Sequence, residues 1–213
     1  TNSGTLVVPG TATISASGQA VTLDDSSNNF GTAAITGANV AIRDTNAIIL
    51  GASAVSGTYS VTAGGAITDS GALAITGVTT IAADSGNNIT LDHTSNNFQG
   101  AVQITSGNNV TLVDAGAIDL GASTVSGTYA VTATAGGDIT DSGVLAITGT
   151  SAFTVAGGRN ITLDQSSTFS STVTFASSGT IASVTINDSN AFDLKTLTTT
   201  GNLTVTAGGN ITD

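Results

Sequence analysis

Aspartate is the residue type with the clearest potential for chemistry in this 213-residue chain. The sequence has 14 acidic residues, and all of them are Asp because no Glu occurs. Nine of them recur at three positions of a repeated pattern: Asp24, Asp92 and Asp164; Asp44, Asp114 and Asp188; Asp69, Asp141 and Asp213. Grouped carboxylates are typical of Ca²⁺ sites, in which about six to eight oxygens surround one ion.

Spacing argues against a shared metal ion. Equivalent Asp residues are expected three coils apart in the fold derived below, which is roughly 14 Å and too far for one ion. The glycine-rich calcium motif of other solenoids, GGxGxD, is absent. We interpret the Asp residues as caps of their own turns that also keep the chain soluble, with sporadic cation binding as the alternative. The sequence therefore predicts no metal site and no cofactor.

Acid–base catalysis is not indicated by the remaining ionisable residues. His93 is the only histidine, and Asp25 and Gln165 stand at the equivalent positions, so the repeats do not require it. A glycan-cleaving enzyme needs clustered carboxylates, usually with cationic side chains in one groove. The chain has only three cations, and none recurs between repeats: Arg43, Arg159 and Lys195. We predict that the protein is not an enzyme and has no catalytic residues.

Composition excludes several other classes. The net charge of −11 leaves no basic face for nucleic acid. Without Cys there is neither a disulfide framework nor a thiolate metal site. No apolar run approaches the roughly 20 residues that a membrane-spanning helix needs. Hydrophobic residues still make up 39% of the chain, so it is not disordered by composition.

Internal repeats organise the whole sequence. Residues 51–77 and 121–149 are nearly identical in sequence, and the similarity extends on both sides of each segment. Three abutting units follow, 3–69, 70–141 and 142–213, which we treat as one continuous domain over 1–213. The third unit is the most diverged and lacks the GAS-x-VSGTY stretch. Repeats at such periods are typical of solenoids.

Alternation of apolar and polar residues predicts short strands. Ile89-Thr90-Leu91-Asp92 places Ile and Leu on one face, and Gly, Asn and Ser precede such strands repeatedly. The first apolar residues of these strands are Val21, Val40, Ile67, Ile89, Val110, Ile139, Ile161, Val184 and Ile211, and the first six intervals are 19, 27, 22, 21, 29 and 22 residues. If each lap returns to the same place, the fold is all-β: a right-handed parallel β-helix of about nine coils.

Other residue types take their places in this fold. The interior is expected to hold Val, Ile, Leu, Ala and the six Phe residues. The turn residues Asn39, Asn88, Asn109, Asn160 and Asn210 are predicted to form a ladder, helped by the tolerance of Asn for the left-handed conformation. Sequons for glycosylation at Asn88, Asn109, Asn160, Asn202 and Asn210 are interpreted as a by-product of turn Asn and outward Thr.

Family resemblance rests on these laps. The GNN-(I/V)-TL and SG-x-L-x-(I/V)-TG patterns resemble the β-helical region of filamentous-haemagglutinin-type exoproteins, which are large bacterial surface adhesins. The resemblance covers the whole chain, although no secretion domain is recognisable in it. It implies an extracellular or cell-surface rod with an adhesive role. Expected partners are neighbouring repeats or further copies end to end, with a host, cell-surface or glycan ligand unidentified and neither nucleic acid nor membrane insertion involved.

Two further functions remain open. Thr is abundant, as in Thr11-x-Thr13 and Thr204-x-Thr206, so an ice-binding face is an alternative, although no regular two-column array is visible. Both ends of the chain fall in one register of the repeat and lack a polar cap. We expect a segment of a longer array, and also expect isolated copies to stack end to end as a filament.

Overall fold

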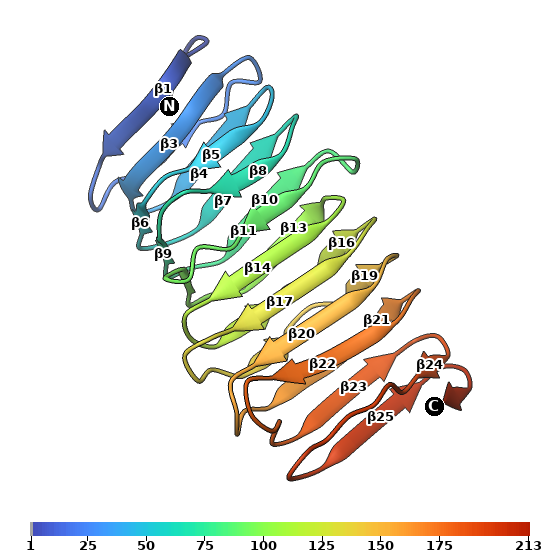
Figure 1. Cartoon of the computed structure of the whole chain (residues 1–213). Helices are drawn as coiled ribbons and strands as arrows, with labels where there is room; N and C mark the ends of the chain where they lie inside the picture. Colours follow the sequence, from blue (N-terminus) through green and yellow to red (C-terminus); the bar gives the residue numbers. More distant parts are fainter. Residues whose placement is uncertain (1) are drawn as a thin grey trace.

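A computed structural model describes residues 2–213 as an all-β rod. Its strands lie across the rod axis, with the two ends of the chain at opposite ends of the stack (Figure 1). Every strand pair is parallel, and the pairs form two 12-stranded sheets and one two-stranded sheet. The predicted parallel β-helix is confirmed, with about ten coils against the nine expected.

Each coil has three strands, which define three faces of the rod. The coil that starts at β4 (Val40–Asp44) shows the order, because β5 (Ile48–Leu50) and β6 (Ser53–Val55) follow before β7 (Tyr59–Ala63) stacks on β4. We number the faces in this order. Parallel strands one coil apart are about 4.8 Å from one another, so ten coils give a rod roughly 48 Å long.

The faces follow from the order of the strands along the chain. Face 1 contains β2 (Val21–Leu23), β4, β7, β10 (Thr79–Ala83), β13 (Val102–Ser106), β16 (Ser123–Val125) and β19 (Leu145–Ile147). Face 2 contains β5, β8 (Ile67–Asp69), β11 (Ile89–Leu91), β14 (Val110–Asp114), β17 (Tyr129–Ala133), β20 (Ser151–Val155) and β22 (Val173–Ser177). Face 3 contains β6, β9 (Leu73–Ile75), β12 (Asn97–Phe98), β15 (Ile118–Leu120), β18 (Ile139–Asp141), β23 (Val184–Asp188) and β25 (Leu203–Ala207).

Five further strands complete the rod. β3 (Asn29–Gly37) bends from face 2 to face 3 and pairs with both β5 and β6. β1 (Val7–Ser15) lies on β3 at the N-terminal end. β21 (Ile161–Phe169) pairs with both β18 and β19, and so bends from face 3 to face 1. β24 (Phe192–Asp193) and β26 (Ile211–Thr212) pair at the C-terminal end.

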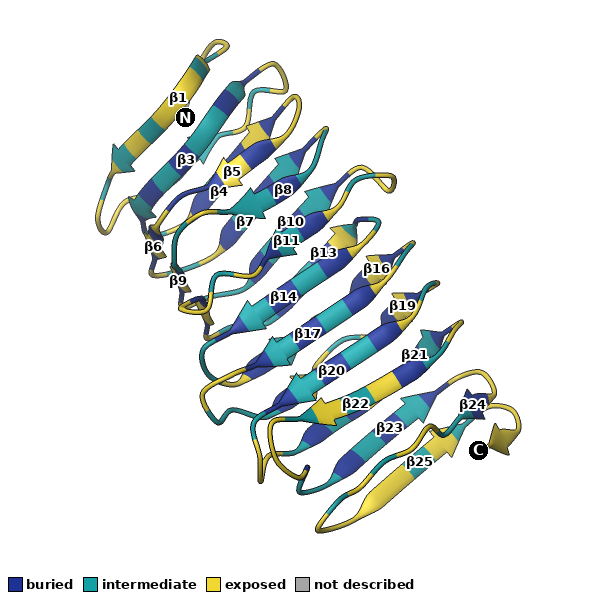
Figure 2. Cartoon of the chain, in the orientation of Figure 1, coloured by how far each residue is buried: buried dark blue, intermediate teal, exposed yellow. Residues whose placement is uncertain are grey.

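Inward-facing side chains form one continuous core. The burial of the inner strands alternates residue by residue, as the sequence predicts, whereas β1 and β25 are largely exposed (Figure 2). Five of the six Phe are buried, and Phe175 packs partly buried against them. Phe153 is the centre of an aromatic group, with ring centroids 6.1 Å from Phe169 and 6.2 Å from both Tyr129 and Phe175. Burial of this apolar interior is the main source of stability in the rod.

The shorter intervals of the sequence pattern correspond to true neighbours. Val21 lies beside Val40, and Ile67, Ile89 and Val110 lie in one column. Ile139, Ile161 and Val184 form another column. These strands start at equivalent corners, so their first apolar side chains stack inside the rod.

The two long intervals, of 27 and 29 residues, do not correspond to single coils. The neighbour of Val40 on the next coil is Tyr59 and not Ile67, which belongs to the following face. Similarly, Tyr129 is the neighbour of Val110. A lap of 27 or 29 residues is therefore one coil plus one face. The turn-and-strand signal marks the start of a strand, whichever face that strand lies on.

Successive sequence units consequently rotate around the rod. The strands that begin at Val40, Val110 and Val184 are equivalent in sequence, yet they lie on faces 1, 2 and 3. Each unit contains three coils and one additional face. Three units therefore account for about ten coils and return the pattern to its first face.

Side chains at the strand starts connect adjacent coils. The amide oxygen of Asn39 accepts the backbone N–H of Thr58 at 2.9 Å, and Asn109 binds Thr128 in the same way at 3.0 Å. Asn88 accepts both the backbone and the side-chain N–H of Asn109, each at 3.2 Å. The predicted Asn ladder is therefore limited to the pair Asn88 and Asn109, because Asn39 is followed on the next coil by Thr58 and Asn160 binds Asp138. The left-handed conformation predicted for these residues is wrong, because only Gly has positive φ in residues 2–213.

Candidate functional site

The Asp residues at the ends of the five-residue strands β4, β14 and β23 form hydrogen bonds inside the rod that connect adjacent coils. Asp114 is fully buried, and its two oxygens accept the backbone N–H of Phe98 and of Gly116, both at 2.6 Å. Asp44 binds Phe30 and Asn46 in the same way, at 2.6 and 2.8 Å. Each carboxylate therefore caps its own turn and also holds the Phe of the preceding coil.

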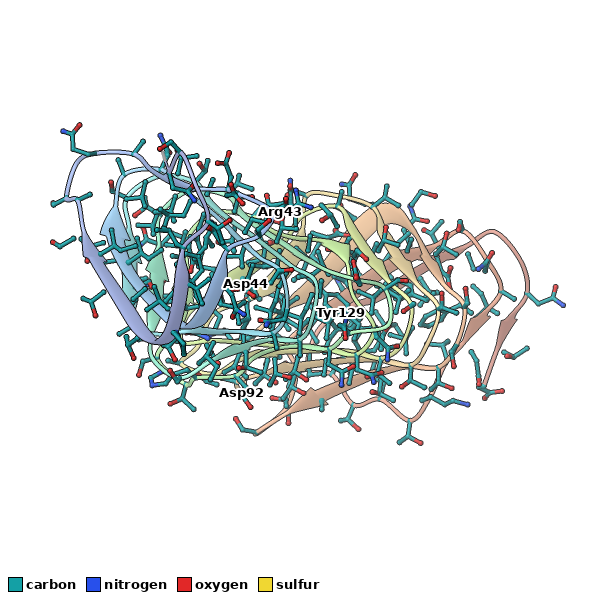
Figure 3. The ribbon with its side chains drawn as sticks, turned by 90° about the horizontal axis from the view of Figure 1, so that it is seen from above. Arg43, Asp44, Asp92 and Tyr129 are labelled. Carbon is teal, nitrogen blue, oxygen red and sulfur yellow. The ribbon has the colours of Figure 1, made fainter. Side chains whose placement is uncertain are left out.

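Asp188 binds the equivalent two N–H groups in the third unit, but through one oxygen, Oδ1, and with longer bonds. It accepts the N–H of Phe169 at 3.3 Å and of Asn190 at 3.0 Å. Burial raises the pKa of Asp114, and the two backbone N–H groups oppose that shift. Figure 3 shows Asp44 inside the body of the rod and Asp92 at its edge. The prediction that Asp caps its own turn is thus confirmed for Asp44, Asp114 and Asp188. Their additional bonds to a Phe of the preceding coil were not predicted from the sequence.

A second class of Asp joins one coil to the next. Asp69 accepts the backbone N–H of Asp92 at 3.1 Å, and its other oxygen accepts the side-chain N–H of Asn96 at 2.6 Å. Asp141 likewise accepts the backbone N–H of Asp164 at 2.9 Å. Its Oδ2 is buried without a hydrogen-bond partner among the described residues.

One substitution between units accounts for this difference. Asn28, Asn96 and Ser167 are equivalent, fully buried, and each accepts the backbone N–H of a leucine at 2.9 to 3.0 Å. Ser167 is too short to donate to Asp141 as Asn96 does to Asp69. We had not selected these residues from the sequence. The recurrence of Asn or Ser two positions before Phe was the available signal.

Asp141 makes the stability of the rod depend on pH. Burial, aided by the carboxylates of Asp164 and Asp119, raises its pKa to about 6 against the N–H bonds from Asp164 and Gln165. Between about pH 4 and 6 the folded chain binds more protons than the unfolded chain, so stability falls as pH rises through this window, by about 2 to 3 kcal/mol. We expect Ser167→Asn to donate a hydrogen bond to Asp141 Oδ2. The difference in unfolding free energy between pH 4 and pH 7, measured by urea unfolding, should then be smaller than in the wild type.

Asp141→Asn is the matched control. This variant removes the titrating carboxyl group. Its free energy of unfolding should therefore lack the pH-dependent component of Asp141, even though Ser167 is unchanged. If wild type and both variants lose equal stability between pH 4 and 7, Asp141 is not the group responsible.

The other ionisable residues are dispersed. His93 lies in a turn, where its Nδ1 accepts the N–H of Ser95 at 3.2 Å. Arg43 and Arg159 are exposed, and Lys195 pairs with the neighbouring Asp193 on the surface. Asp24 is exposed on an outer turn. Within the described part of the chain, no group of three or more potential ligands could hold a metal ion.

Outward Thr residues form single columns. Thr140, Thr162, Thr185 and Thr204 lie beside one another on four successive coils of face 3. Thr68, Thr90 and Thr111 form a shorter column on face 2, which continues with Ala130. Beside Thr162 stands Asp164, and beside Thr185 stands Asn187. The columns are therefore one residue wide over most of their length.

Buried tyrosines occupy equivalent positions in the first two units. Tyr59 and Tyr129 are fully buried, and this burial raises the pKa of both phenols. The nearby hydroxyl groups of Ser53 and Ser123 oppose the rise. Neither hydroxyl has a hydrogen-bond partner in residues 2–213. The next coil places a small residue beside each ring, Thr79 and Ser151 respectively. These tyrosines fill the core and do not form a polar site.

The fold and the side-chain hydrogen bonds together define a β-solenoid repeat protein in which polar residues that recur between the units hold adjacent coils together. A family model of repeats of unknown function, DUF5649, matches residues 1–36, 37–105, 107–176 and 182–213. The chain belongs to this family of repeats. No curated protein and no solved structure matches it. No helix able to cross a membrane occurs in the described residues.

Proposed function

We propose that the chain is a structural rod segment, the stalk of a large bacterial adhesin that is secreted or attached to the cell surface. The observation that carries this proposal is the rotation of the units. Because each unit advances the pattern by one face, no face keeps the same surface chemistry along the whole rod. A spacer tolerates such rotation, whereas an extended binding face requires one chemistry on one side.

The use of the polar residues supports the same role. Asp44, Asp114 and Asp188 bind backbone N–H groups inside the rod, and Asp69 and Asp141 bind the coil that follows. These carboxylates increase cohesion along the axis and are not free to bind a ligand. Adhesive contacts to a host, cell-surface or glycan ligand would come from exposed loops or from other parts of an adhesin.

Rod length should scale with the number of units. Deleting 70–141 joins Asp69 to Ser142 and recreates the Asp–Ser junction that already separates the units. We expect a folded rod that is shorter by roughly 16 Å, or about three and a third coils, with an unchanged cross-section in small-angle X-ray scattering. Adding a copy of 70–141 at the same junction should lengthen the rod equally.

Surface display tests the stalk role itself. The chain is placed between a cell-surface anchor and a terminal epitope in one-, three- and five-unit versions. Antibody access to the epitope above the cell's polysaccharide layer should increase with unit number. Equal access in all versions, or a cross-section that changes with unit number, contradicts a spacer function.

An ice-binding face is the second candidate, favoured by the four-residue Thr column on face 3. Its single-file geometry and the rotation of the units favour the stalk instead. Thermal hysteresis of the purified chain separates the two. If the purified chain separates the freezing point from the melting point of ice, and Thr162→Lys abolishes this difference, the stalk proposal is wrong and the function is ice binding.

A further inference from the structure

A notch opens at the corner between faces 1 and 2, on coils inside the stack. Two five-residue turns, 24–28 and 84–88, lie there three coils apart, with the three-residue turns 45–47 and 64–66 between them. Because the longer turns extend further from the axis, they border the notch, and the shorter turns form its floor. The adjoining strands β4, β7 and β10 each pair with a strand on both sides. The site therefore belongs to the continuous part of the rod.

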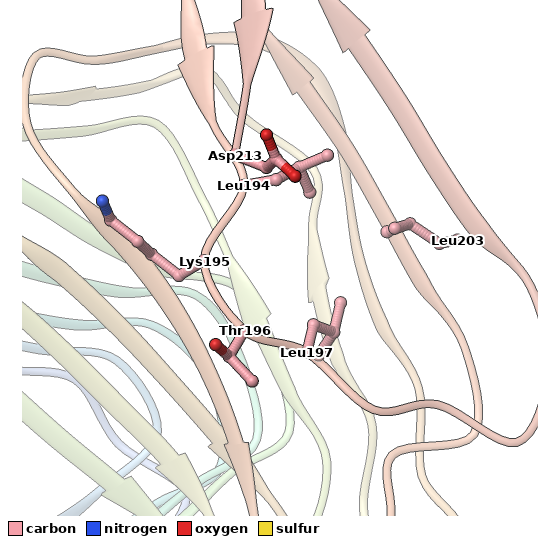
Figure 4. A pocket seen from close by; sticks show the side chains of 6 residues that line it. All are labelled: Leu194, Lys195, Thr196, Leu197, Leu203 and Asp213. Atoms are coloured by element: carbon pink, nitrogen blue, oxygen red, sulfur yellow. The ribbon is translucent and has the colours of Figure 1, made fainter.

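Side chains without internal hydrogen bonds line this notch, which has a volume of about 190 Å³. Arg43, Thr45 and Asp84 are exposed and Thr62 is half-buried, and none of these four side chains is hydrogen-bonded within the described residues. The one salt bridge of residues 2–213 lies elsewhere, so Arg43 and Asp84 do not neutralise each other. A cavity of about 440 Å³ beside the last coil differs in character, because three leucines line it (Figure 4). The notch is a polar site with unused donors and acceptors.

The two charges of the notch lie at its opposite borders. Arg43 lies beside Thr62 on the next coil, and Thr62 lies beside Ala82 on the coil after that. The backbones at Arg43 and Ala82 are therefore roughly 10 Å apart, and Asp84 follows two residues after Ala82. A ligand that contacts both charges must span the notch and meet threonine hydroxyls between them. This geometry favours a molecule that carries an acidic group and several neutral polar groups spread over its length.

Comparison with the other units shows that the fold does not require these charges. Val113 and Ala156 stand at the positions of the second unit that are equivalent to Arg43 and Asp84. In the third unit Asn187 replaces Arg43. The turn equivalent to 64–66 is also two residues longer in the second unit. The charged notch therefore occurs once, and its side chains are free for a role other than folding.

We propose that this notch binds one uronic acid residue of an acidic polysaccharide. The proposal rests on the rod function and names the ligand class of its exposed turns. The carboxylate of the sugar pairs with the guanidinium of Arg43, the strongest polar contact that the notch offers. Its hydroxyl groups donate to the carboxylate of Asp84 and exchange hydrogen bonds with the hydroxyls of Thr45 and Thr62. A volume of about 190 Å³ is below the roughly 300 Å³ at which sites for drug-sized ligands begin, so it suits a single sugar residue.

The charge of the chain makes Arg43 the decisive contact. A net charge of −11 repels a polyanion from most of the surface, so an acidic glycan can approach only where a cation is exposed. Lys195 is already paired with Asp193, and Arg159 lies against Gly136 at a different corner. Arg43 is the cation that stands between hydroxyl groups and opposite a free carboxylate.

Titration of the full chain with tri-mannuronic acid, followed by nuclear magnetic resonance, tests the site. Amide shifts are expected in the turns 45–47, 64–66 and 84–88, with one site per chain. The dissociation constant should be on the order of 1 mM, because a single sugar residue supplies few contacts. Arg43→Val and Asp84→Ala introduce the residues of the second unit, which the rod accommodates, and each should weaken binding about tenfold or more.

Matched controls separate the notch from general charge effects. Arg159→Asn removes the same kind of cation from another corner and introduces the residue of the first unit, Asn87, so this variant should bind like wild type. Mannotriose has the same rings without the carboxylates and should not bind. If Arg43→Val loses its dispersed amide spectrum, Arg43→Asn replaces it, since Asn187 is the residue of the third unit.

Four outcomes overturn the proposal. They are no shift at about 10 mM trisaccharide, ten times the expected dissociation constant; equal loss of affinity in Arg43→Val and Arg159→Asn; equal binding of mannotriose; and equal binding of tri-glutamate, which would assign the notch to acidic peptides. Each of them leaves the stalk function standing. A notch that binds the trisaccharide as expected, in a rod whose display of an epitope does not increase with unit number, refutes the stalk alone.

Discussion

Replacing Asp114 with Ala is expected to lower the free energy of unfolding by about 3 to 5 kcal/mol. The substitution removes a buried carboxylate that accepts two backbone N–H groups at 2.6 Å, those of Phe98 and Gly116. Both donors then lack a partner, and the tie between adjacent coils is lost. Urea unfolding followed by circular dichroism measures the change.

Asp92→Ala is the control for this effect. Asp92 carries the same charge, but its side chain is exposed and makes no hydrogen bond in the described structure, so its loss should change stability by no more than about 0.5 kcal/mol. The equivalent Asp188→Ala should cost less than Asp114→Ala, because its bonds are longer, at 3.0 and 3.3 Å. Equal, small effects at Asp114 and Asp92 would show that the internal ties do not stabilise the rod.

Phe153→Ala should be comparably damaging, with a loss of about 3 to 5 kcal/mol. Phe153 is fully buried and contacts three aromatic rings from the coils on either side. Ala leaves a cavity that the rigid stack of strands cannot close, since each strand is fixed by two parallel neighbours. The same urea titration measures the loss.

Phe153→Ile provides the comparison at this position. Ile81 is the equivalent residue of the preceding unit and is also fully buried, so the strand accommodates this side chain. The expected cost is only about 1 to 2 kcal/mol. If Phe153→Ala were no worse than Phe153→Ile, the aromatic group would not contribute to the stability of the third unit.

The sequence predicted the strands and the core well, for a clear physical reason. Alternation such as Ile89-Thr90-Leu91 depends only on the two-residue period of a strand, so it identifies buried positions without knowledge of neighbours. The glycines at the corners between strands were equally clear as turn positions in the sequence. A Cβ on Gly77 would lie 2.6 Å from the backbone of Gly57, so coils stacked this closely require glycine there.

The register was harder to predict because the sequence signal is local. The turn-and-strand motif at Val40 and at Ile67 has the same residue types, and nothing near either residue encodes which face it occupies. The face depends on how many strands the intervening chain contributes, and β6 and β7 contribute two between Ile48 and Ile67. The strand at Tyr59 lacks the Asn-rich signal and was therefore overlooked as a member of the column.

The roles of the polar residues were only half visible. A capping Asp is evident from the turn residues that follow it, whereas the bond from Asp114 to Phe98 spans a coil and depends on the register. The orphan oxygen of Asp141 depends on Ser167, 26 positions away in the chain. Such pairs become apparent only when the coils are stacked.

Cysteine pairs test the rotation of the units most directly, since the native chain has no Cys. Ala41 lies beside Ser60 on the next coil, and Thr68 lies on a different face beside Ile49. Disulfides need Cα atoms about 4.4 to 6.8 Å apart. Under mild oxidation, Ala41→Cys with Ser60→Cys should form an intramolecular disulfide, and Ala41→Cys with Thr68→Cys should stay reduced. Cross-linking of the second pair in place of the first would contradict the three-face register and the ten-coil period built on it.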